Sequence, residues 1–540
     1  MCSKNLLLIL SILLTCILFS ASSQSSKDIQ SYIQKGEYEK AIPILKEALK
    51  KNPTDTNLKK ALFLCYFQLG LKKYEANELA TAAEHFHNAL NIDPSSIPAR
   101  QNLALTLLRL GNLSEAKRVI EEGLNTTPPD RNLLLILAQI YQKEGSTEKV
   151  ISTLEEIHKN YPNDRETGLI LASIYYSQMK LQEARRIYQD LEKAYPQDTQ
   201  IILRVAKTYE DEQKWDDAIA QYEKILKIEP KNIEVYRMIA RLYERENNID
   251  KAIEVYERAI KSVPEAGNLY FWLGELYEKK GDTDSALANY KKATDLSVEH
   301  PLPYYKLALQ EKDPNQKDQL LKQAVNKGVR LLEQLEQRLL LNIGEKTSLE
   351  NLRGSLELAE EIEKLEKTLR SALDAYLFPP GSETSEKAEK DLQSLLKRYP
   401  QSRILLEYTG AILEKKEQWD RALEVWTKIL QRNARVERAH LGMGRAYEAK
   451  GEWEKARLAY RRALELDEKD EDAYNGLVRM SEKTGKLGEL VEEWQRKARF
   501  PSYRRNLLFL TRLEQLLRKV GKEDEADKIK KQIDELKITD

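Results

Sequence analysis

The sequence predicts an all-α protein in which helical hairpins stack in series as an α-solenoid. The first observation is a proline that recurs with a period of 34 residues, at Pro94, Pro128, Pro162, Pro196, Pro230 and Pro264. The second is a small residue with the same period, at Ala104, Ala138, Ala172, Ala206, Ala240 and Gly274. A fixed period in this range marks a repeat array, whose units bury their apolar faces only against their neighbours.

Each period describes a helix-turn-helix unit. A large residue follows the small one, at Leu107, Tyr141, Tyr175, Tyr209, Tyr243 and Tyr277. Small residues let two helix backbones approach, and the large residues fill the groove between them. The proline ends the second helix because it lacks an N–H and clashes with the preceding turn.

One unit, residues 267–300, carries the most complete pattern: Leu273-Gly274, Tyr277, Gly281, Ala286, Tyr290 and Ala293. In these residues the chain resembles the tetratricopeptide repeat (TPR) family, whose 34-residue hairpin has Leu-Gly, Tyr, Ala, aromatic, Ala and Pro at fixed positions. Val298 stands where the family has its proline, and Pro301 follows. The resemblance implies a right-handed superhelix that binds a partner along its concave face.

Composition sets limits on the function. The 540 residues include 87 basic and 87 acidic side chains, so the net charge is zero. A chain of this length exceeds a single compact core, whereas an elongated array has a thin, continuous one. Balanced charge argues against nucleic acid as the partner, since such binding usually needs a basic face.

Residues 1–23 differ from the rest of the chain. Lys4 precedes an apolar run from Leu6 to Phe19, and small residues follow up to Ser23. This pattern is typical of a secretory signal peptide, and the run is short for a membrane-spanning helix. We expect an exported protein, in the periplasm or associated with the envelope, with cleavage near Ser22 or Ser23.

A second processing route ends at Cys16. Leu13-Leu14-Thr15-Cys16 resembles a bacterial lipoprotein cleavage box, in which the cysteine is acylated, although Thr15 departs from the usual small residue. An uncleaved anchor is the third alternative. Loss of the signal leaves Cys65 alone, which excludes an internal disulfide and predicts a buried helix residue.

The repeat pattern and the signal-like start together predict four segments. Residues 1–23 form the signal, 24–328 an N-terminal TPR array, 329–384 a helical linker with a hinge, and 385–540 a C-terminal TPR array with a capping helix. Pro53 and Pro94 are separated by 41 residues, so we expect a lengthened hairpin whose tip, near Gly70, projects from the array.

The linker has helical spacing without the repeat. Apolar residues between Leu349 and Tyr376 step by three or four, which predicts a long amphipathic helix. The narrow stripe suits packing against the flanking arrays better than a coiled-coil dimer seam. Phe378-Pro379-Pro380-Gly381-Ser382 then ends the helix and marks the hinge.

No group of residues indicates an enzyme, a metal or a cofactor. The histidines are scattered, at His85, His87, His158, His300 and His440. Gly442-Met443-Gly444 imitates a dinucleotide loop but falls inside a helix with no strand before it. The tyrosine series from Tyr141 to Tyr277 is interpreted as core.

The resemblance places partner binding on the first helix of each unit. The residues that it assigns to the groove are Gln139, Gln142, Ser173, Tyr176, Lys207, Arg237, Arg241, Arg245, Phe271 and Glu275, with Leu135, Leu169 and Leu203 beside them. The three arginines share one helix face, so an extended peptide with an apolar half and an acidic end suits the groove.

Two further features bear on the partner. The family's pair for clamping a chaperone tail, Lys and Asn four residues apart, is absent, so a chaperone co-factor is not expected. Residues 496–505 interleave basic side chains with Phe500 and Tyr503, which suits an anionic surface, although most such loops are only solvated.

These observations predict a non-enzymatic protein–protein interaction scaffold of the cell envelope, in assembly, secretion or surface-polymer export. Its partners are proteins or peptides, not nucleic acid, and it meets the membrane only through an amino-terminal lipid or signal anchor. The alternative is a glycan-binding or lipid-anchored structural organiser of the periplasm. An enzyme with accessory repeats is the third possibility, and the absence of any long non-repeat region counts against it.

Overall fold

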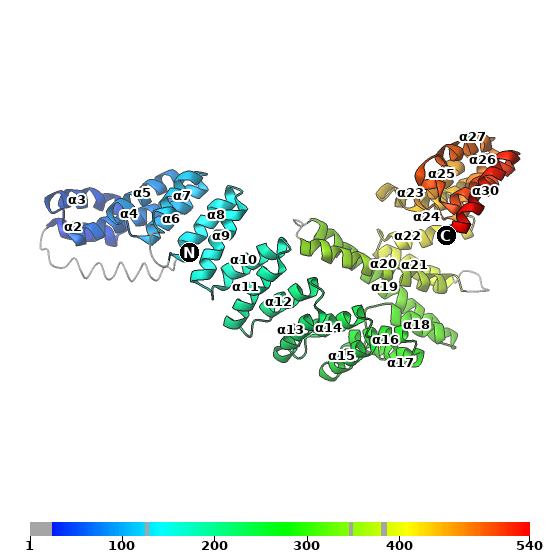
Figure 1. The fold of residues 1–540 in the computed structure, drawn as a ribbon, viewed down its shortest axis with the longest axis horizontal. Coiled ribbons are helices and arrows are strands. Elements are labelled where there is room, and N and C mark those ends of the chain that lie inside the picture. Colours follow the sequence, from blue (N-terminus) through cyan, green and yellow to red (C-terminus); the bar gives the residue numbers. More distant parts are fainter. Residues whose placement is uncertain (1–23, 125–128, 345–348, 380–385, 540) are drawn as a thin grey trace. The chain divides into compact units, whose positions relative to one another are not determined.

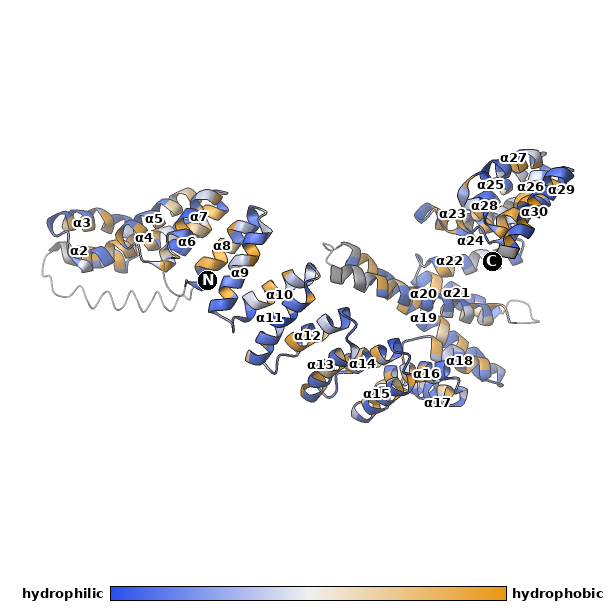
Figure 2. Cartoon of the chain, viewed as in Figure 1, coloured by the Kyte–Doolittle hydropathy of each residue, from blue (hydrophilic) through white to orange (hydrophobic). Residues whose placement is uncertain are grey.

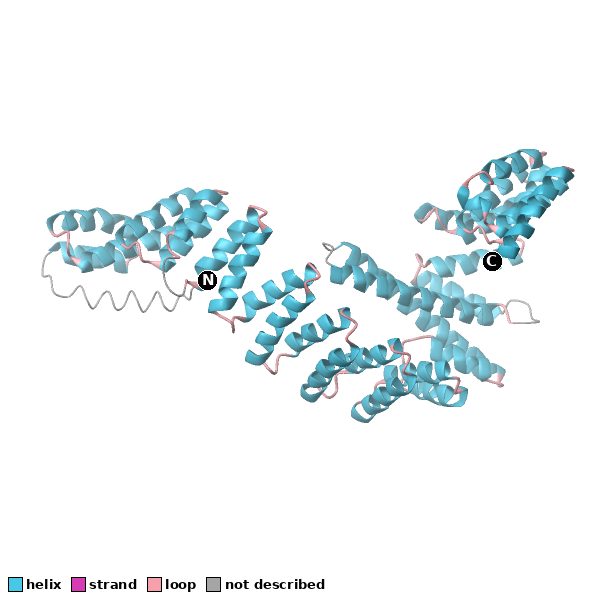
Figure 3. Ribbon diagram, viewed as in Figure 1, coloured by secondary structure: helices cyan, strands magenta, loops and turns pink. Residues whose placement is uncertain are grey.

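The computed structural model describes residues 24–124, 129–344, 349–379 and 386–539 (Figure 1). Among these residues the regular secondary structure is helical, with short turns between helices (Figure 3). This confirms the all-α, α-solenoid prediction. The predicted signal sequence with Cys16, and the segment Pro380-Gly381-Ser382 of the predicted hinge, lie outside the described residues.

Contacts divide the chain into two compact units, Met1–Asn248 and Ile249–Asp540, which we call unit 1 and unit 2. In unit 1 the described helices form consecutive hairpins. They are α2 (Gln24–Gln34), α3 (Tyr38–Lys51), α4 (Thr56–Glu75), α5 (Leu79–Ile92), α6 (Ile97–Arg109), α7 (Leu113–Glu121), α8 (Arg131–Lys143), α9 (Thr147–Asn160), α10 (Arg165–Ser177), α11 (Leu181–Ala194), α12 (Thr199–Asp211), α13 (Trp215–Ile228) and α14 (Ile233–Arg245).

Unit 2 continues with hairpins on both sides of two long helices. Its described helices are α15 (Ile249–Ser262), α16 (Gly267–Lys280), α17 (Thr283–Asp295), α18 (Leu302–Gln310), α19 (Pro314–Gly344), α20 (Leu349–Leu377), α21 (Glu386–Arg398), α22 (Arg403–Lys415), α23 (Trp419–Arg432), α24 (Glu437–Ala449), α25 (Trp453–Leu466), α26 (Glu471–Lys483), α27 (Leu487–Lys497), α28 (Pro501–Arg504), α29 (Leu507–Lys519) and α30 (Glu523–Thr539).

Small residues lie where the helices of a hairpin meet, as predicted. Ala218 and Ala252 are fully buried. A Cβ added to Gly444 would lie 2.7 Å from the Tyr460 ring, so this ring packs directly on the glycine backbone. In Figure 2 most helices carry both apolar and polar residues, as amphipathic helices do. The core is therefore a seam between paired helices.

The turn inside most of the described repeat hairpins contains one residue with positive φ. Glycine takes this place at Gly145, with φ of 72°, but Met179 and Gln213 take it with φ of 59° and 58°. A side chain disfavours this left-handed conformation, which glycine adopts freely. The turn is therefore a property of the repeat geometry and is kept even where the sequence offers no glycine.

The lengthened hairpin near Gly70 differs from the prediction. Helix α4 has 20 residues while α5 has 14, so the added residues belong to the first helix alone. Phe86 packs against Gly70 as Tyr460 packs against Gly444, which places the extra turns at the start of α4. The predicted projecting tip is wrong, because the extension lies at the opposite end of the hairpin.

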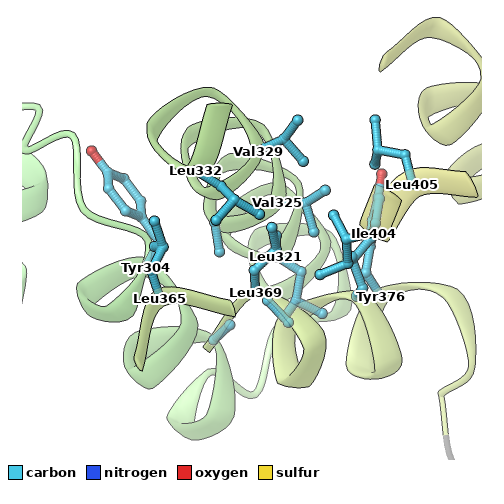
Figure 4. Packing of buried hydrophobic residues seen from close by; sticks show 14 of the residues in the cluster. Tyr304, Leu321, Val325, Val329, Leu332, Leu365, Leu369, Tyr376, Ile404 and Leu405 are labelled. Atoms are coloured by element: carbon cyan, nitrogen blue, oxygen red, sulfur yellow. The ribbon is translucent and has the colours of Figure 1, made fainter. Parts of the chain in front are cut away.

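The predicted linker is a packed helical hairpin, α19 and α20, joined to its neighbours by one apolar cluster (Figure 4). Leu365, Leu369 and Tyr376 of α20 are buried against α19. The part of the apolar stripe from Leu365 to Tyr376 thus packs within the chain, whereas Leu356 is 68% exposed. Helix α19 continues through residue 329, so the predicted boundary between 328 and 329 falls inside a helix.

Cys65 is fully buried in α4, as expected, and burial raises the pKa of its thiol to about 12. Among the helices that the structure describes, none is both long enough and apolar enough to cross a membrane.

Candidate partner-binding surface

Successive first helices of unit 1 are joined near their starts by side chains. Asp130, Asp164 and Asp198 occupy the N-cap positions of α8, α10 and α12. A donor from the preceding hairpin reaches each carboxylate: Gln101 Nε2 at 3.3 Å from Asp130, Arg131 Nη2 at 3.0 Å from Asp164, and Arg165 Nε at 2.8 Å from Asp198. These contacts fix the spacing of the helices that carry the predicted surface.

Asp164 shows how strongly this junction holds its charge. Burial by itself would raise the pKa of the Asp164 carboxyl, but hydrogen bonds from Arg131 and Thr167 outweigh burial and lower that pKa. The carboxylate is therefore ionised at neutral pH and serves as a structural acceptor. It is not available to a partner.

The structure leaves most of the predicted groove residues of unit 1 open to solvent. Gln139, Gln142 and Ser173 on α8 and α10 are exposed, as are Arg241 and Arg245 on α14. Tyr176, Lys207 and Arg237 are half-buried, and so are Leu135, Leu169 and Leu203. We call the set Gln139, Gln142, Ser173, Tyr176, Lys207, Arg237, Arg241 and Arg245 the inner strip.

Contacts between neighbouring first helices show that the inner strip is continuous from α10 to α14. The Tyr176 hydroxyl donates to Asp211 of the next repeat. One repeat further on, Arg245 Nη1 donates to Glu210 Oε1 at 3.1 Å. Glu210 also accepts a hydrogen bond from the Tyr222 hydroxyl at 2.9 Å. These bonds hold α10, α12 and α14 side by side at this face.

The three arginines are less available than their residue types indicate. Besides its bond to Glu210, Arg245 lies over the Trp215 ring, 5.7 Å from the centroid. Arg237 approaches Glu234 of its own helix at 3.9 Å. Arg241 also interacts with a neighbouring group. The basic stripe is thus partly neutralised by carboxylates of the same surface.

Two predicted groove residues, Phe271 and Glu275, belong to unit 2. Phe271 is only 5% exposed, and its ring stacks on His300 with centroids 4.3 Å apart. It is a packing residue in this structure, because the helix turns its ring into the hairpin core. Glu275 is half-buried on the same helix.

The tyrosine series is core only in part. Tyr175 is buried, whereas Tyr141, Tyr209, Tyr243 and Tyr277 are half-buried. The Tyr277 hydroxyl donates to Glu257 at 3.1 Å, and the Gln189 amide donates to the Tyr209 hydroxyl at 3.2 Å. The Tyr277 and Tyr209 hydroxyls thus reach polar partners on the helices that precede their own, α15 and α11. The interpretation as ligand-stacking rings finds no support.

The basic segment 496–505 spans the end of α27 and the short helix α28. Phe500 is 61% exposed there, while the Tyr503 ring packs on Phe509 with centroids 4.6 Å apart.

In the described parts of the chain, no group of three or more His, Cys, Asp or Glu side chains is arranged to hold a metal ion.

Comparison with known families identifies the repeat. Models described as tetratricopeptide repeat match residues 30–56, 73–140, 133–164, 169–233 and 237–298, and one described as TPR repeat matches residues 444–477. A curated relative, interferon-induced protein with tetratricopeptide repeats 3 from Mus musculus, is 27% identical over 114 residues. This match covers 21% of the present chain and 27% of that relative, so the chain spans about a quarter of the relative's length.

The comparison with solved structures gives matches at low sequence identity and low TM-score. The structure of Naa15/Naa10 bound to HypK-THB has a TM-score of 0.40 and 16% identity, and the match covers 97% of this chain and 76% of that one. A tetratricopeptide repeat protein from Parabacteroides merdae ATCC 43184 has a TM-score of 0.27 and 17% identity, over 48% of this chain and 98% of that one. The family models by themselves show that the chain is a member of the tetratricopeptide repeat family, whose members generally act as non-catalytic protein–protein interaction scaffolds.

Proposed function

We propose that this chain is an exported scaffold of the cell envelope and that the inner strip of unit 1 holds an extended segment of a partner protein. The supporting observation is the run of exposed and half-buried polar side chains on α8, α10, α12 and α14. The Tyr176–Asp211 and Arg245–Glu210 bonds keep α10, α12 and α14 in register. Export is supported by the signal-like pattern of residues 1–23.

The residue types of the inner strip suit an extended peptide. Gln139 and Gln142 offer amides that both donate and accept, as an unpaired peptide main chain requires. Half-buried Leu135 and Leu169 lie on the same helices and can cover apolar side chains of the peptide. Toward α14 the strip offers Lys207 and Arg241, so an acidic end of the peptide lies best there.

Charge reversal on α14 tests the assignment. The double variant Arg237→Glu/Arg241→Glu leaves Arg245 on Glu210, so the contact between α12 and α14 persists. The partner is the protein that the purified mature chain retains from envelope extract, and its apparent Kd is measured for the variant and for the unmodified chain. The variant is expected to bind this partner at least about tenfold more weakly, because desolvated arginines at the centre of an interface contribute much of the binding energy. Helical circular dichroism and the melting temperature are expected to stay unchanged.

The matched control is Arg186→Glu/Lys227→Glu, which makes the same charge change at exposed positions of the second helices α11 and α13. Its affinity is expected to remain within about twofold of the unmodified protein, since exposed charges away from an interface contribute little. Equal losses in the two double variants would contradict the assignment to the inner strip. Recovery of a polysaccharide without protein would favour the glycan-binding organiser.

The proposed export is tested by a separate measurement, the mass of the mature chain. The intact mass of the protein purified from cells is expected to correspond to a chain that begins just after Ser22 or Ser23. A diacylated chain that begins at Cys16 would show that the protein is processed as a lipoprotein and not cleaved near Ser22 or Ser23. The proposed envelope location would still hold. A chain that retains residues 1–23 in the soluble fraction would contradict export.

A further inference from the structure

A cavity of about 130 Å³ lies among α25, α26, α27 and α29, in the last repeats of unit 2. Its walls include the buried side chains of Leu464, Leu477, Trp494 and Phe509. Trp494 and Phe509 stack with ring centroids 4.9 Å apart. Leu508, also in the wall, is 38% exposed and marks the open side. The lining also includes polar and charged residues: Arg461, Glu465, Glu468, Glu493, Lys497, Tyr503, Asn506 and Arg512. The cavity therefore combines a cluster of buried apolar side chains with a polar remainder of the wall and has an entrance from solvent.

The cavity exists because the repeat becomes irregular here. The second helix α27 has 11 residues, whereas the second helix of the preceding hairpin, α25, has 14. The chain then makes the extra turn α28 before it enters α29. A shortened helix leaves the space that its last turn would have filled, whereas protein interiors usually contain few voids larger than a water molecule.

Trp494 differs from the aromatic residues at the same place in the two preceding hairpins. The Trp426 indole donates to Glu414 at 2.8 Å, and the Tyr460 hydroxyl donates to Glu448 at 2.5 Å. Trp494 makes ring contacts with Phe509 and with Tyr474, but its indole N–H has no hydrogen bond in the described part of the chain. A donor is therefore unused in the cavity wall.

Arg461, at the rim, supplies a second unused donor. Its Nη2 pairs with Glu493 at 2.9 Å, but its Nε is buried and has no acceptor. Buried polar atoms in proteins nearly always have a partner, so one that lacks it requires an explanation. Lys497 also pairs with Glu493, at 3.0 Å, so the rim carries both signs of charge and selects no charged ligand.

We propose that this cavity receives a leucine-sized apolar side chain from a partner peptide, and that Arg461 and Trp494 donate hydrogen bonds to the peptide's main-chain carbonyls. An apolar cavity of roughly 150 Å³ holds a benzene ring, so the space here suits an aliphatic side chain of similar or smaller size. The proposal rests on the proposed function only in taking a peptide as the ligand.

Two capped pentapeptides test the ligand class on the full mature chain: Gly-Gly-Leu-Gly-Gly and Gly-Gly-Ala-Gly-Gly. Their Kd values follow from saturation-transfer NMR titrations. The leucine peptide is expected to bind about tenfold more tightly or better, because only its side chain fills the cavity. Equal binding of the two peptides, or no binding of either at millimolar concentration, would overturn the proposal.

Variants of the cavity locate the binding. Leu508→Trp obstructs the entrance without replacing a buried side chain, and it is expected to abolish binding of the leucine pentapeptide. Leu458→Trp is the matched control, since Leu458 is 51% exposed on α25 and lies outside the cavity wall. Its Kd is expected to stay within about twofold of the unmodified protein. Unchanged binding by Leu508→Trp would show that the peptide lies elsewhere.

Arg461→Lys tests the hydrogen-bonding part. Lysine keeps the positive charge beside Glu493 but removes the buried Nε–H, so the Kd of the leucine pentapeptide is expected to be several-fold weaker. A Kd equal to that of the unmodified protein would show that Arg461 is not part of the site.

The variant Arg237→Glu/Arg241→Glu separates this proposal from the proposed function. Loss of the envelope partner with intact pentapeptide binding supports both assignments, and loss of pentapeptide binding alone refutes only the cavity.

Discussion

Arg479 donates two hydrogen bonds to Glu448, each at 3.0 Å, and so ties α26 to α24 of the preceding repeat. Glu448 also accepts the Tyr460 hydroxyl from its own hairpin. Burial would raise the pKa of Glu448, but the bonds from Arg479 and Tyr460 outweigh it and lower that pKa. One carboxylate thus joins both helices of a hairpin to the next hairpin.

The same three-part contact recurs in both units. In each case a glutamate near the end of the first helix accepts from an aromatic residue twelve positions later and from a cation of the next repeat. The examples are Glu210 with Tyr222 and Arg245, Glu278 with Tyr290 and Lys306, and Glu414 with Trp426 and Arg445. The contact is therefore part of the stacking geometry.

The first prediction separates the two bonds of Glu448. Glu448→Ala leaves the Tyr460 hydroxyl without its acceptor, which is expected to cost about 1–3 kcal/mol of local unfolding free energy. Arg479→Ala is expected to cost less than about 1 kcal/mol, because the Arg479 side chain is 53% exposed. Amide hydrogen exchange in α24 and α25 measures both. Equal losses of unfolding free energy in the two variants would show that the bond from Arg479, and not the bond from Tyr460, accounts for the stability that this contact contributes.

The second prediction concerns the positive φ at Gln213. Gln213→Gly removes the clash of a side chain in the left-handed conformation and is expected to stabilise the α12–α13 hairpin by about 0.5–1 kcal/mol. The reciprocal change, Gly145→Gln in the α8–α9 hairpin, is expected to destabilise by a similar amount. Thermal denaturation of the two variants gives the sign. Destabilisation by Gln213→Gly would mean that the Gln213 side chain makes a contact that stabilises the hairpin by more than the left-handed conformation costs.

The third prediction tests the register of the hairpin seam. Ala218→Trp places a large ring between closely packed helices and is expected to destabilise by about 1–3 kcal/mol or more. Ala220→Trp, two residues along the same helix but exposed, is expected to change stability by no more than about 0.5 kcal/mol. Urea unfolding followed by circular dichroism compares the two. A smaller loss for the buried position would invalidate the register.

The fourth prediction concerns pH. Burial lowers the pKa of His300 to about 4, below the value of about 6.5 in an unfolded chain. The unfolded chain therefore takes up a proton first as the pH falls, so stability decreases between pH 6.5 and pH 4 and reaches a loss of about 2 kcal/mol at pH 5. Above pH 6.5 the histidine is neutral in both states and contributes no dependence.

The variant His300→Asn removes this titration and can still accept the Leu302 N–H, which His300 Nδ1 accepts at 3.3 Å. Melting temperatures at pH 7 and pH 5 are expected to differ less for His300→Asn than for the unmodified chain. An identical pH dependence in the two proteins would assign the acid sensitivity to other groups.

The sequence by itself determined the class of the fold and the register of the repeat. Proline ends a helix and a small residue lets two helices approach wherever they occur, so Pro230 and Ala218 could be interpreted without a structure. The open side chains of Gln139, Gln142 and Ser173 followed from the same register, because a helix has a fixed periodicity. Their role in binding stays a prediction.

Only the tertiary structure decided what each side chain meets across repeats. Arg245 belongs to the predicted basic stripe, yet Glu210, 35 residues earlier, neutralises it, and no local pattern reports such a contact. Phe271 turns into the core because His300 offers it a ring to stack on. The cavity at Trp494 arises where a helix stops one turn early, and the space that it leaves depends on four helices at once. Local sequence determines helices, turns and their period, whereas side-chain partners depend on distances that exist only after the hairpins have stacked.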